Sequence, residues 1–189
     1  MACEVAVFSK QLRIRDTLVT IRNAEEADAQ ALVDMMNRMD AESDFLTREP
    51  GEFMMTAERE AKFIASRKES PSFRFMVAEV DGVLVGVADA YYQTKARYRH
   101  VGEVSIAISK AFWGKGIGRA MLEEGIGWLA ENGVEKIHLT VDASNLRAIS
   151  LYLKLGFCVV GTIPDYKKMR DGAYHNGYIM VLDVASRQK

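Results

Sequence analysis

Apolar and polar residues alternate over much of the chain, which is the pattern of half-buried strands. The alternation predicts strands over residues 17–22, 73–80, 83–92, 100–108, 136–141, 157–163 and 174–184. Asp81-Gly82 separates two of these runs, and an Asp-Gly pair between alternating segments is a strong hairpin signal. The chain is therefore expected to contain at least one antiparallel hairpin.

Four segments instead repeat their apolar residues with a helical period. They predict helices over residues 23–38, 57–67, 117–132 and 145–155. Asn23 with Glu26 has the spacing of a capping box at the first helix, and Gly133 and Gly156 stand where the third and fourth helices should end. The side chains expected in the core from the first helix are Ala27, Leu32, Met35 and Met36.

Hairpin signals beside strand–helix–strand signals indicate an α/β fold with a mixed sheet. A length of 189 residues suits one domain with a substantial core. No repeat, linker or low-complexity segment divides the sequence, so a single domain is expected over residues 1–189. Residues 1–16 form an N-terminal extension, for which an added strand is left open.

The composition argues against several classes of function. Hydrophobic residues make up 49% of the chain and charged residues 27%, and the net charge is −1, so nucleic acid is not an expected partner. No apolar run approaches the roughly 18 residues of a membrane span, and the N-terminus lacks a signal-peptide pattern. Cys3 and Cys158 make no disulfide framework, which favours a cytoplasmic location. Cys158 is expected to be a buried filler rather than a nucleophile.

Metal chemistry has little support in the sequence. His100, His138 and His175 are scattered, and none has a cysteine or carboxylate at the spacing of a metal site. His138 lies in an alternating segment and is expected to be a packed or edge residue of a strand. No metal is therefore expected.

Glycine is concentrated where the strand over 100–108 leads into the helix over 117–132. Residues 112–119 read FWGKGIGR. Glycine lets backbone approach a ligand closely, and the first amides of a helix lack internal partners and lie at the positive end of its dipole. This glycine turn therefore predicts a binding site for a phosphate-bearing cofactor.

Other interpretations of the glycine turn can be weighed on the sequence. The GxxxxGK[ST] pattern of a Walker loop is absent. A dinucleotide site would use Gly116 and Gly118, but Met121 stands at its third glycine position; Asp142 would be its ribose-binding acid. A helix start that merely tolerates glycine is the remaining alternative.

A second group of residues lies in the helix over 145–155. Asn145, Ala148 and Tyr152 are spaced i, i+3 and i+7, and so share one helical face. An amide, a small residue and a phenol on one face suit a polar wall for a ligand, although tyrosine often packs with only its hydroxyl at a rim. The glycine turn earlier in the chain favours the ligand wall.

Together the two segments resemble the GNAT superfamily of acyl-CoA-dependent N-acyltransferases. The family's phosphate motif, [RQ]-x-x-G-x-[GA], is matched by WGKGIG over residues 113–118, with Trp113 in the Arg/Gln place. Its second motif is matched by Asn145, Ala148, Tyr152, Lys154, Gly156 and Phe157. The resemblance covers residues from about 17 to 184. It implies a GNAT-like, mostly antiparallel mixed sheet of about six to seven strands, flanked by about four helices, with central strands that splay apart at the CoA cleft.

The resemblance implies acetyl-CoA as a co-substrate, held between the strand that ends at Ile108 and the strand over 136–141. The pyrophosphate would take amides of the glycine turn, backbone at Ile108 would pair with the pantetheine arm, and Asn145 would hydrogen-bond this arm. The cofactor-binding residues implied are Ile108, Trp113, Gly114, Lys115, Gly116, Ile117, Gly118, Arg119, Asn145, Ala148, Tyr152 and Lys154.

The same resemblance implies that an amine attacks the thioester directly, with Tyr152 as general acid for the leaving thiolate. A carboxylate usually helps the amine lose its proton, and Glu103 is the candidate because it begins the strand that ends at Ile108. Alternation puts Glu103, Ser105 and Ala107 on one face and Ile108 on the other, unless a bulge intervenes. An edge-strand charge that faces water is the other interpretation of Glu103.

The expected function is therefore an N-acetyltransferase that modifies a primary amine. A catalytically silent acetyl-CoA sensor is the alternative, against which Tyr152 argues. The acceptor is a small amine or a peptide or protein N-terminus, and a homodimer is left open. Residues 38–52 would favour a cationic acceptor if they lined its cleft, and a solvated loop is the other interpretation. This segment carries Asp40, Glu42, Asp44, Glu49 and Glu52 against Arg38 and Arg48, a net charge of −3.

Overall fold

The computed structural model describes residues 8–185 and forms two compact units. The first comprises residues up to Ala90 together with Ser105–Gly125, and the second comprises Tyr91–Val104 and the chain from Ile126 onward. Cys3 lies outside the described residues. Among the described residues, no helix is long and apolar enough to cross a membrane.

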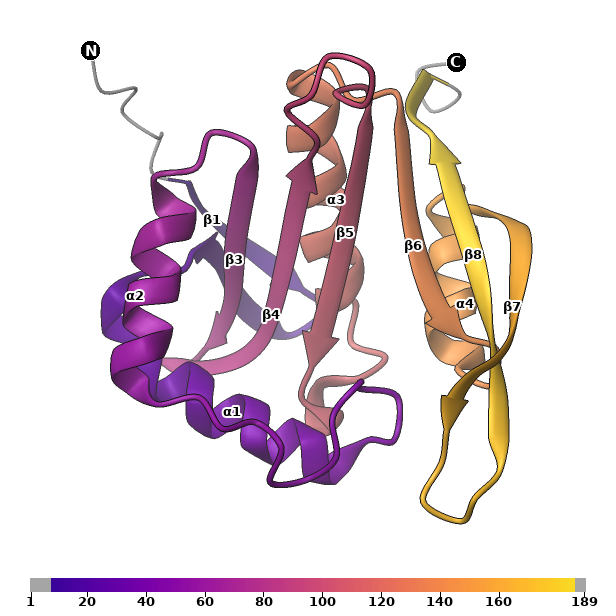
Figure 1. Cartoon of the computed structure of the whole chain (residues 1–189). Coiled ribbons are helices and arrows are strands. Elements are labelled where there is room, and N and C mark those ends of the chain that lie inside the picture. Colours follow the sequence, from indigo (N-terminus) through magenta and orange to yellow (C-terminus); the bar gives the residue numbers. More distant parts are fainter. Residues whose placement is uncertain (1–7, 186–189) are drawn as a thin grey trace. The chain divides into compact units, whose positions relative to one another are not determined.

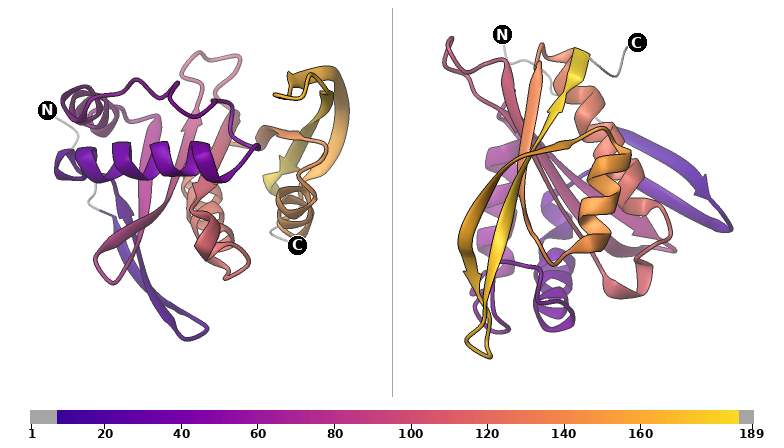
Figure 2. Two further views of the ribbon diagram at one scale, coloured as in Figure 1. Left: turned by 90° about the horizontal axis from the view of Figure 1, so that it is seen from below. Right: turned by 90° about the vertical axis from the view of Figure 1, so that its right-hand side faces the viewer.

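Helices lie on both faces of the strands in the first unit. In chain order its elements are β1 (Ser9–Ile14), β2 (Thr17–Asn23), η1 (Glu26–Asp28), α1 (Ala29–Glu42), α2 (Ala57–Lys68), β3 (Phe73–Val80) and β4 (Val83–Tyr92). They are followed by β5 (Val101–Ile108), η2 (Lys110–Phe112) and α3 (Ile117–Glu131), of which β5 begins and α3 ends in the second unit. Helices α1 and α2 cover one face of these strands and α3 the other (Figures 1 and 2).

The second unit contains three further strands and one helix. They are β6 (Lys136–Asp142), α4 (Leu146–Lys154), β7 (Cys158–Lys168) and β8 (Tyr174–Asp183). Strand β8 pairs with both β6 and β7, and α4 lies against one face of these strands (Figure 2).

Strand order along the sheet is β1-β2-β3-β4-β5-β6-β8-β7. The pairs β1–β2, β2–β3, β6–β8 and β7–β8 are antiparallel, whereas β5 and β6 are parallel. The β5–β6 register covers three positions and ends at Glu103 opposite His138, although both strands continue beyond these residues. The sheet is therefore mixed and mostly antiparallel.

Two apolar clusters stabilise the first unit, one on each face of its strands. Met76 and Ala78 pack with Ile117 and Met121 of α3, whereas Val77 between them packs on the other side. On that side the cluster contains Leu32, Met35 and Met39 of α1 and Ile64 of α2. This alternation along β3 is the two-residue period that the sequence pattern predicted.

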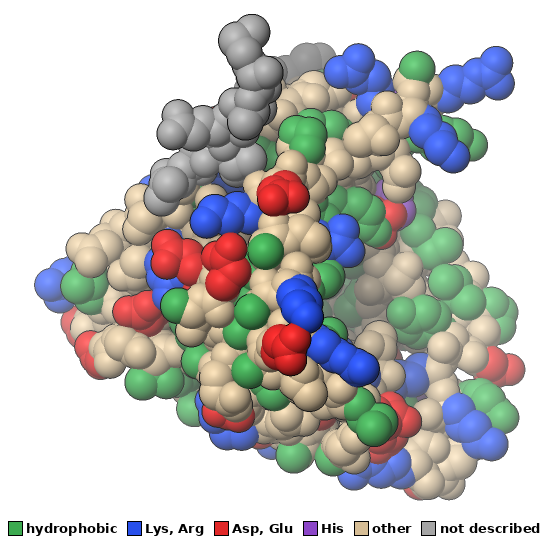
Figure 3. All heavy atoms as spheres, turned by 60° about the vertical axis from the view of Figure 1, so that its left-hand side comes forward, with side chains coloured by type: hydrophobic (Ala, Val, Ile, Leu, Met, Phe, Trp, Pro, Cys, Tyr) green, Lys and Arg blue, Asp and Glu red, His purple; other side chains and the backbone are tan. Residues whose placement is uncertain are grey.

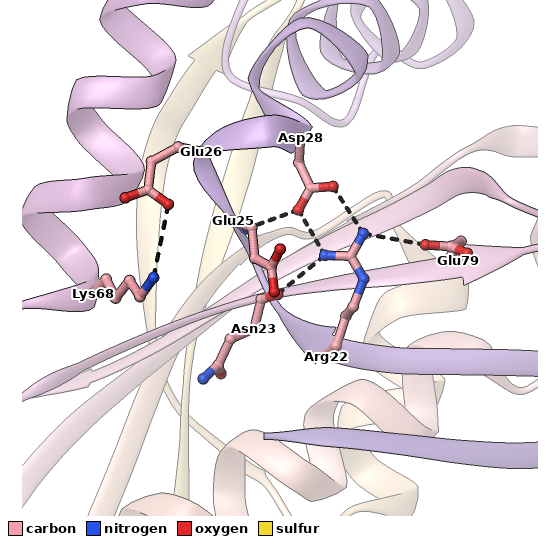
Figure 4. A network of polar contacts seen from close by, with 7 residues as sticks. All are labelled: Arg22, Asn23, Glu25, Glu26, Asp28, Lys68 and Glu79. Atoms are coloured by element: carbon pink, nitrogen blue, oxygen red, sulfur yellow. Dashed lines mark hydrogen bonds and ion pairs between the residues drawn. The ribbon is translucent and has the colours of Figure 1, made fainter. Parts of the chain in front are cut away.

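A polar network fixes the start of the first helical segment (Figure 4). The two Nη atoms of Arg22 donate to the two carboxylate oxygens of Asp28 at 2.7 and 2.8 Å, and Nη2 also donates to Glu79 at 3.1 Å. Burial alone would raise the pKa of Asp28, but the bonds from Arg22 and from the Glu25 amide outweigh it and lower the pKa. The network therefore joins β2, β3 and η1.

The first helix begins and ends later in the chain than the sequence pattern predicted. Its capping box is formed by Glu25 and Asp28, not by Asn23 and Glu26, and leads into η1 before α1. Of the side chains expected in the core, Leu32 and Met35 are buried, Met36 is partly buried and Ala27 is exposed. The η1 turn shifts the helical phase, so that Ala29 is buried instead.

Over residues 8–185 the sheet has eight strands, where about six to seven were expected. The added strand is β1, which pairs with β2 and lies in the segment for which a strand was left open. Strand β7 also runs to Lys168, through an irregular register between Ile163 and Lys167 where Asp165 has φ of 49°. The prediction that Cys158 is buried is wrong, because β7 is an edge strand and this side chain is exposed.

Candidate functional site

The glycine turn in the first unit presents an open stretch of backbone. Gly114 and Gly116 have positive φ, 72° and 95°, and both residues are exposed. A Cβ at Gly114 would meet nothing within 4 Å, whereas one at Gly116 would lie 3.0 Å from Ile14 Cγ2. The turn therefore leaves room for a ligand at Gly114, and at both positions the backbone has a conformation that only glycine adopts without strain.

Helix α3 begins at this turn. The amide of Ala120 donates to the carbonyl of Gly116 at 3.1 Å, which closes the first turn of the helix. The amides of Ile117, Gly118 and Arg119 precede this bond, so they have no acceptor within the helix. These amides and the helix dipole suit an anion. The arrangement fits the phosphate group that the sequence motif implies.

The cationic side chains of the turn have partners on the protein. Lys115 Nζ lies 4.5 Å from the centre of the Phe112 ring, and Arg119 Nε donates to Glu123 at 2.9 Å. Trp113, the departure from the family motif, donates from its indole Nε1 to the Ile108 carbonyl at 2.6 Å. A carbonyl oxygen has two lone pairs, so Ile108 keeps one for the expected pairing with pantetheine.

Strand β5 is an interior strand, so the interpretation of Glu103 as an edge charge is wrong. Glu103 lies opposite His138 on β6, with Oε1 3.5 Å from His138 Nε2. Ala107 packs with the α1–α2 cluster, whereas Ile108 packs with the α3 cluster, so the alternation predicted for this strand holds. His138 was expected to be only a packed or edge residue, and nothing local in the sequence could show its partner 35 positions away.

Helix α4 in the second unit carries the other motif. Asn145 is its N-cap, and the side-chain Oδ1 accepts from the Ala148 amide at 3.1 Å. Tyr152, two turns later, is 9% exposed and packs edge-on against Phe157, with ring centres 5.8 Å apart. Lys154 at the end of the helix is exposed. Among the described residues, the Tyr152 hydroxyl has no hydrogen-bond partner.

Burial raises the pKa of Tyr152 from about 10 to about 12. The phenol is therefore protonated at neutral pH and can donate a proton. Asp142, the acid considered for a ribose, is 4% exposed, and its carboxylate accepts hydrogen bonds from Ser144 and contacts His175. A buried acid with these partners does not suit a ribose hydroxyl, which argues against the dinucleotide interpretation.

Fewer acids of the segment over residues 38–52 are free to bind a cationic acceptor than its composition suggested. Asp40 is 2% exposed, and Arg48 donates to both of its carboxylate oxygens at 3.0 and 3.1 Å. Glu42 accepts from the Lys110 amide at 2.9 Å, just before the glycine turn. Acidic and basic side chains are interspersed on the face drawn in Figure 3. Asp40 is therefore a structural acid and not part of a lining for a cationic acceptor.

Comparison with known proteins defines the class of this chain. The model of the acetyltransferase (GNAT) family matches residues 36–157, which include both motifs. The chain belongs to this family and is an acetyltransferase.

The relatives that the chain resembles are acetyltransferases with different names. The chain is 33% identical over 116 residues to an L-amino acid N-acetyltransferase of Escherichia coli, covering 59% of this chain and 69% of that protein. It is 36% identical over 121 residues to a mycothiol acetyltransferase of Propionibacterium freudenreichii, covering 62% of this chain but 38% of that longer protein. A GNAT acetyltransferase structure from Streptococcus pneumoniae superposes with a TM-score of 0.81 at 30% identity, covering 86% of this chain and 98% of that one.

Proposed function

We propose that this protein transfers the acetyl group of acetyl-CoA to a primary amine by direct attack within a ternary complex. The observation that carries the proposal is the Tyr152 hydroxyl, a buried phenol kept protonated and without a partner among the described residues. It stands on α4, the helix that carries the second family motif. A phenol in this state is equipped to donate a proton to a leaving group.

The donor's pyrophosphate binds the open amides at the start of α3, from Gly114 to Arg119. Lys115 and Arg119 lie in the same segment, where they add positive charge near the phosphates. Trp113 holds the carbonyl of Ile108 and so fixes the end of β5, where the pantetheine arm pairs with backbone.

Asn145 has a narrower role than the motif alone implied. Its Oδ1 is committed to the Ala148 amide, so only its NH₂ group is left for a ligand. Asn145 therefore donates a hydrogen bond to a carbonyl of the pantetheine arm. The bond that caps the helix also sets the plane of the side-chain amide, so that the ligand bond has a fixed direction.

In the reaction, the amine nitrogen attacks the thioester carbonyl carbon and forms the new N–C bond. The C–S bond breaks, its electron pair goes to sulfur, and Tyr152 gives its hydroxyl proton to the thiolate. Before the attack, Glu103 takes one proton from the acceptor ammonium, directly or through a water molecule, and passes it to solvent. After the attack the nitrogen loses its second proton to the same carboxylate, and the phenol is reprotonated from solvent. An ammonium cannot attack, because its lone pair is occupied, so proton removal is as necessary as proton donation.

Glu103 suits the role of base because it lies at the last paired position of β5 and β6. Its carboxylate is partly exposed, which keeps it accessible to water. His138 beside it can exchange a proton with the carboxylate at 3.5 Å after a small movement. The acceptor amine is therefore expected on this face of β5, opposite the side chain of Ile108.

The proposal is tested by thiol release from acetyl-CoA with a panel of amines: free amino acids, short peptides with free N-termini, and polyamines. Tyr152→Phe should lower kcat at least 10-fold with the best amine, because general acid catalysis contributes roughly 10²–10⁴-fold, while acetyl-CoA affinity should change little. The phenyl ring keeps its contact with Phe157, so the fold should persist.

Two outcomes would refute the proposal. One is wild-type turnover by Tyr152→Phe under conditions where the chemical step limits kcat. The other is tight binding of acetyl-CoA by the wild type without thiol release on any amine of the panel, which would identify a silent acetyl-CoA sensor.

A further inference from the structure

The turn between β6 and α4 is held by backbone and side-chain hydrogen bonds. The Asp142 carbonyl accepts from the Asn145 amide at 2.9 Å. Asp142 Oδ1 accepts from the Ser144 amide at 2.8 Å and from the Ser144 hydroxyl at 2.6 Å. The turn thus runs from a buried carboxylate directly to the residue that caps α4.

His175, from strand β8, joins this turn from 31 positions away. Its Nδ1 lies 3.0 Å from Asp142 Oδ2 and 3.2 Å from the Ser144 hydroxyl. The next residue on β8, Asn176, accepts the Ala143 amide at 2.8 Å through its backbone carbonyl. Strand β8 therefore holds both the side chains and the backbone of the turn.

The carboxylate of Asp142 is ionised in the cluster that it forms with Ser144 and His175. Burial would raise the pKa of Asp142, but the hydrogen bonds from Ser144 and the contact with His175 outweigh it, so the pKa is lowered. Asp142 is therefore ionised at neutral pH. Its carboxylate accepts a hydrogen bond from Nδ1 of His175, which carries the ring proton. The carboxylate fixes both the tautomer and the ring orientation of His175.

The geometry is not that of a nucleophilic triad. In such a triad the carboxylate binds one imidazole nitrogen and the serine hydroxyl binds the other. Here Asp142 and Ser144 both approach Nδ1, and Nε2 has no hydrogen-bond partner among the described residues. Ser144 is thus not activated, and the cluster acts on the shape of the turn.

We propose that His175 is a positioning residue for the acetyl donor. By holding Asp142 and Ser144, it fixes the turn that presents the Asn145 NH₂ group to the pantetheine arm. The inference rests on the proposed function, because it assumes that Asn145 contacts the donor. It predicts that loss of the His175 bonds weakens donor binding and leaves the chemical step intact.

Three substitutions of His175 test whether Nδ1 or Nε2 is the nitrogen needed for donor binding. His175→Ala removes both nitrogens and should raise the Kd for CoA and the KM for acetyl-CoA about 10-fold, with kcat within twofold of the wild type. His175→Asn puts an amide N–H where Nδ1 stood and should restore both constants to within about twofold. His175→Gln puts its N–H near Nε2 and should resemble His175→Ala.

Binding is measured by calorimetry with CoA, and turnover by thiol release. Ser144→Ala, which removes one hydroxyl, is a second and milder perturbation and should raise the Kd about threefold even if His175→Ala folds poorly. His100→Asn changes an exposed histidine of the same unit and should leave CoA affinity and turnover unchanged.

Wild-type CoA affinity in folded His175→Ala would overturn the inference. So would a large fall of kcat in His175→Asn with an unchanged KM for acetyl-CoA, because it would mean that the free Nε2 transfers a proton. Failure of the wild type itself to bind CoA would instead overturn the proposed function on which the inference rests.

Discussion

Gly118 offers a test in which protein stability and donor binding should move in opposite directions. It is the second residue of α3 and, unlike Gly114 and Gly116, does not have a positive φ. Gly118→Asp therefore needs no strained backbone. Aspartate is a better helix former than glycine by a few tenths of a kcal/mol, and a carboxylate in the first turn adds about 0.3–1 kcal/mol through the helix dipole. The free energy of unfolding should stay equal or rise by about 1 kcal/mol.

The same carboxylate occupies the anion site. At a separation of about 5 Å and an effective dielectric constant of about 20, each negative charge on the donor's pyrophosphate is repelled by about 3 kcal/mol. One such interaction already corresponds to a loss of affinity of roughly 10²-fold. The Kd for CoA should therefore rise by 10²-fold or more, in a protein that is no less stable.

Calorimetry with CoA and chemical denaturation measure the two effects on one preparation. Gly118→Ala separates the added Cβ from the added charge and should lose far less affinity. Gly127→Asp puts the same charge later in α3, where a Cβ would meet nothing within 4 Å, and should bind CoA like the wild type. If folded Gly118→Asp bound CoA with wild-type affinity, the first turn of α3 would not be the phosphate site.

Three further outcomes follow from the structure. The pKa of Tyr152 is about 10 in the unfolded chain and about 12 in the folded protein, so the folded state holds this proton more tightly. The free energy of unfolding should therefore fall by about 3 kcal/mol as the pH rises from 10 to about 12. Chemical denaturation measures this fall, and Tyr152→Phe should lack it. Glu103→Gln should lower kcat roughly 10²-fold without changing CoA affinity; a kcat within twofold of the wild type would dismiss Glu103 as the base. Gly86→Ala should destabilise the protein by about 1–3 kcal/mol in denaturant, because its Cβ would lie 2.4 Å from Ile108 Cδ1; unchanged stability would show that this side chain moves freely.

The sequence predicted most elements because their signals are local. Alternation located the strands from β2 to β6 within a residue or two, and the helical period located α2, α3 and α4 equally well. Strand β1 was left open because its pattern, SKQLRI, has only two apolar residues and buries neither fully. The early part of β7 was found, but its continuation beyond Pro164 was not, because proline and the irregular register around Asp165 imitate a loop.

The errors share one physical cause. Whether a side chain is buried depends on which elements cover its strand or helix, and local pattern does not report this. Cys158 was expected inside because it opens an apolar strand, but the strand lies at the edge of the sheet. Asp40 was counted with the surface acids, although Arg48, eight positions later, pairs with it in the interior. Neither pairing nor edge position is encoded within a few residues.

In the candidate site too, residues with a local signal could be predicted, and residues brought together by the fold could not. Its motif residues could be found because each motif includes a helix start, where the first four amides have no acceptor within the helix. The two starts solve this need in opposite ways. Helix α3 leaves its first amides open behind glycine, which creates an anion site, whereas α4 closes one amide with Asn145 Oδ1, which leaves an NH₂ group to donate. His138 and His175 act across strands instead, so only the fold could bring them to Glu103 and Asp142.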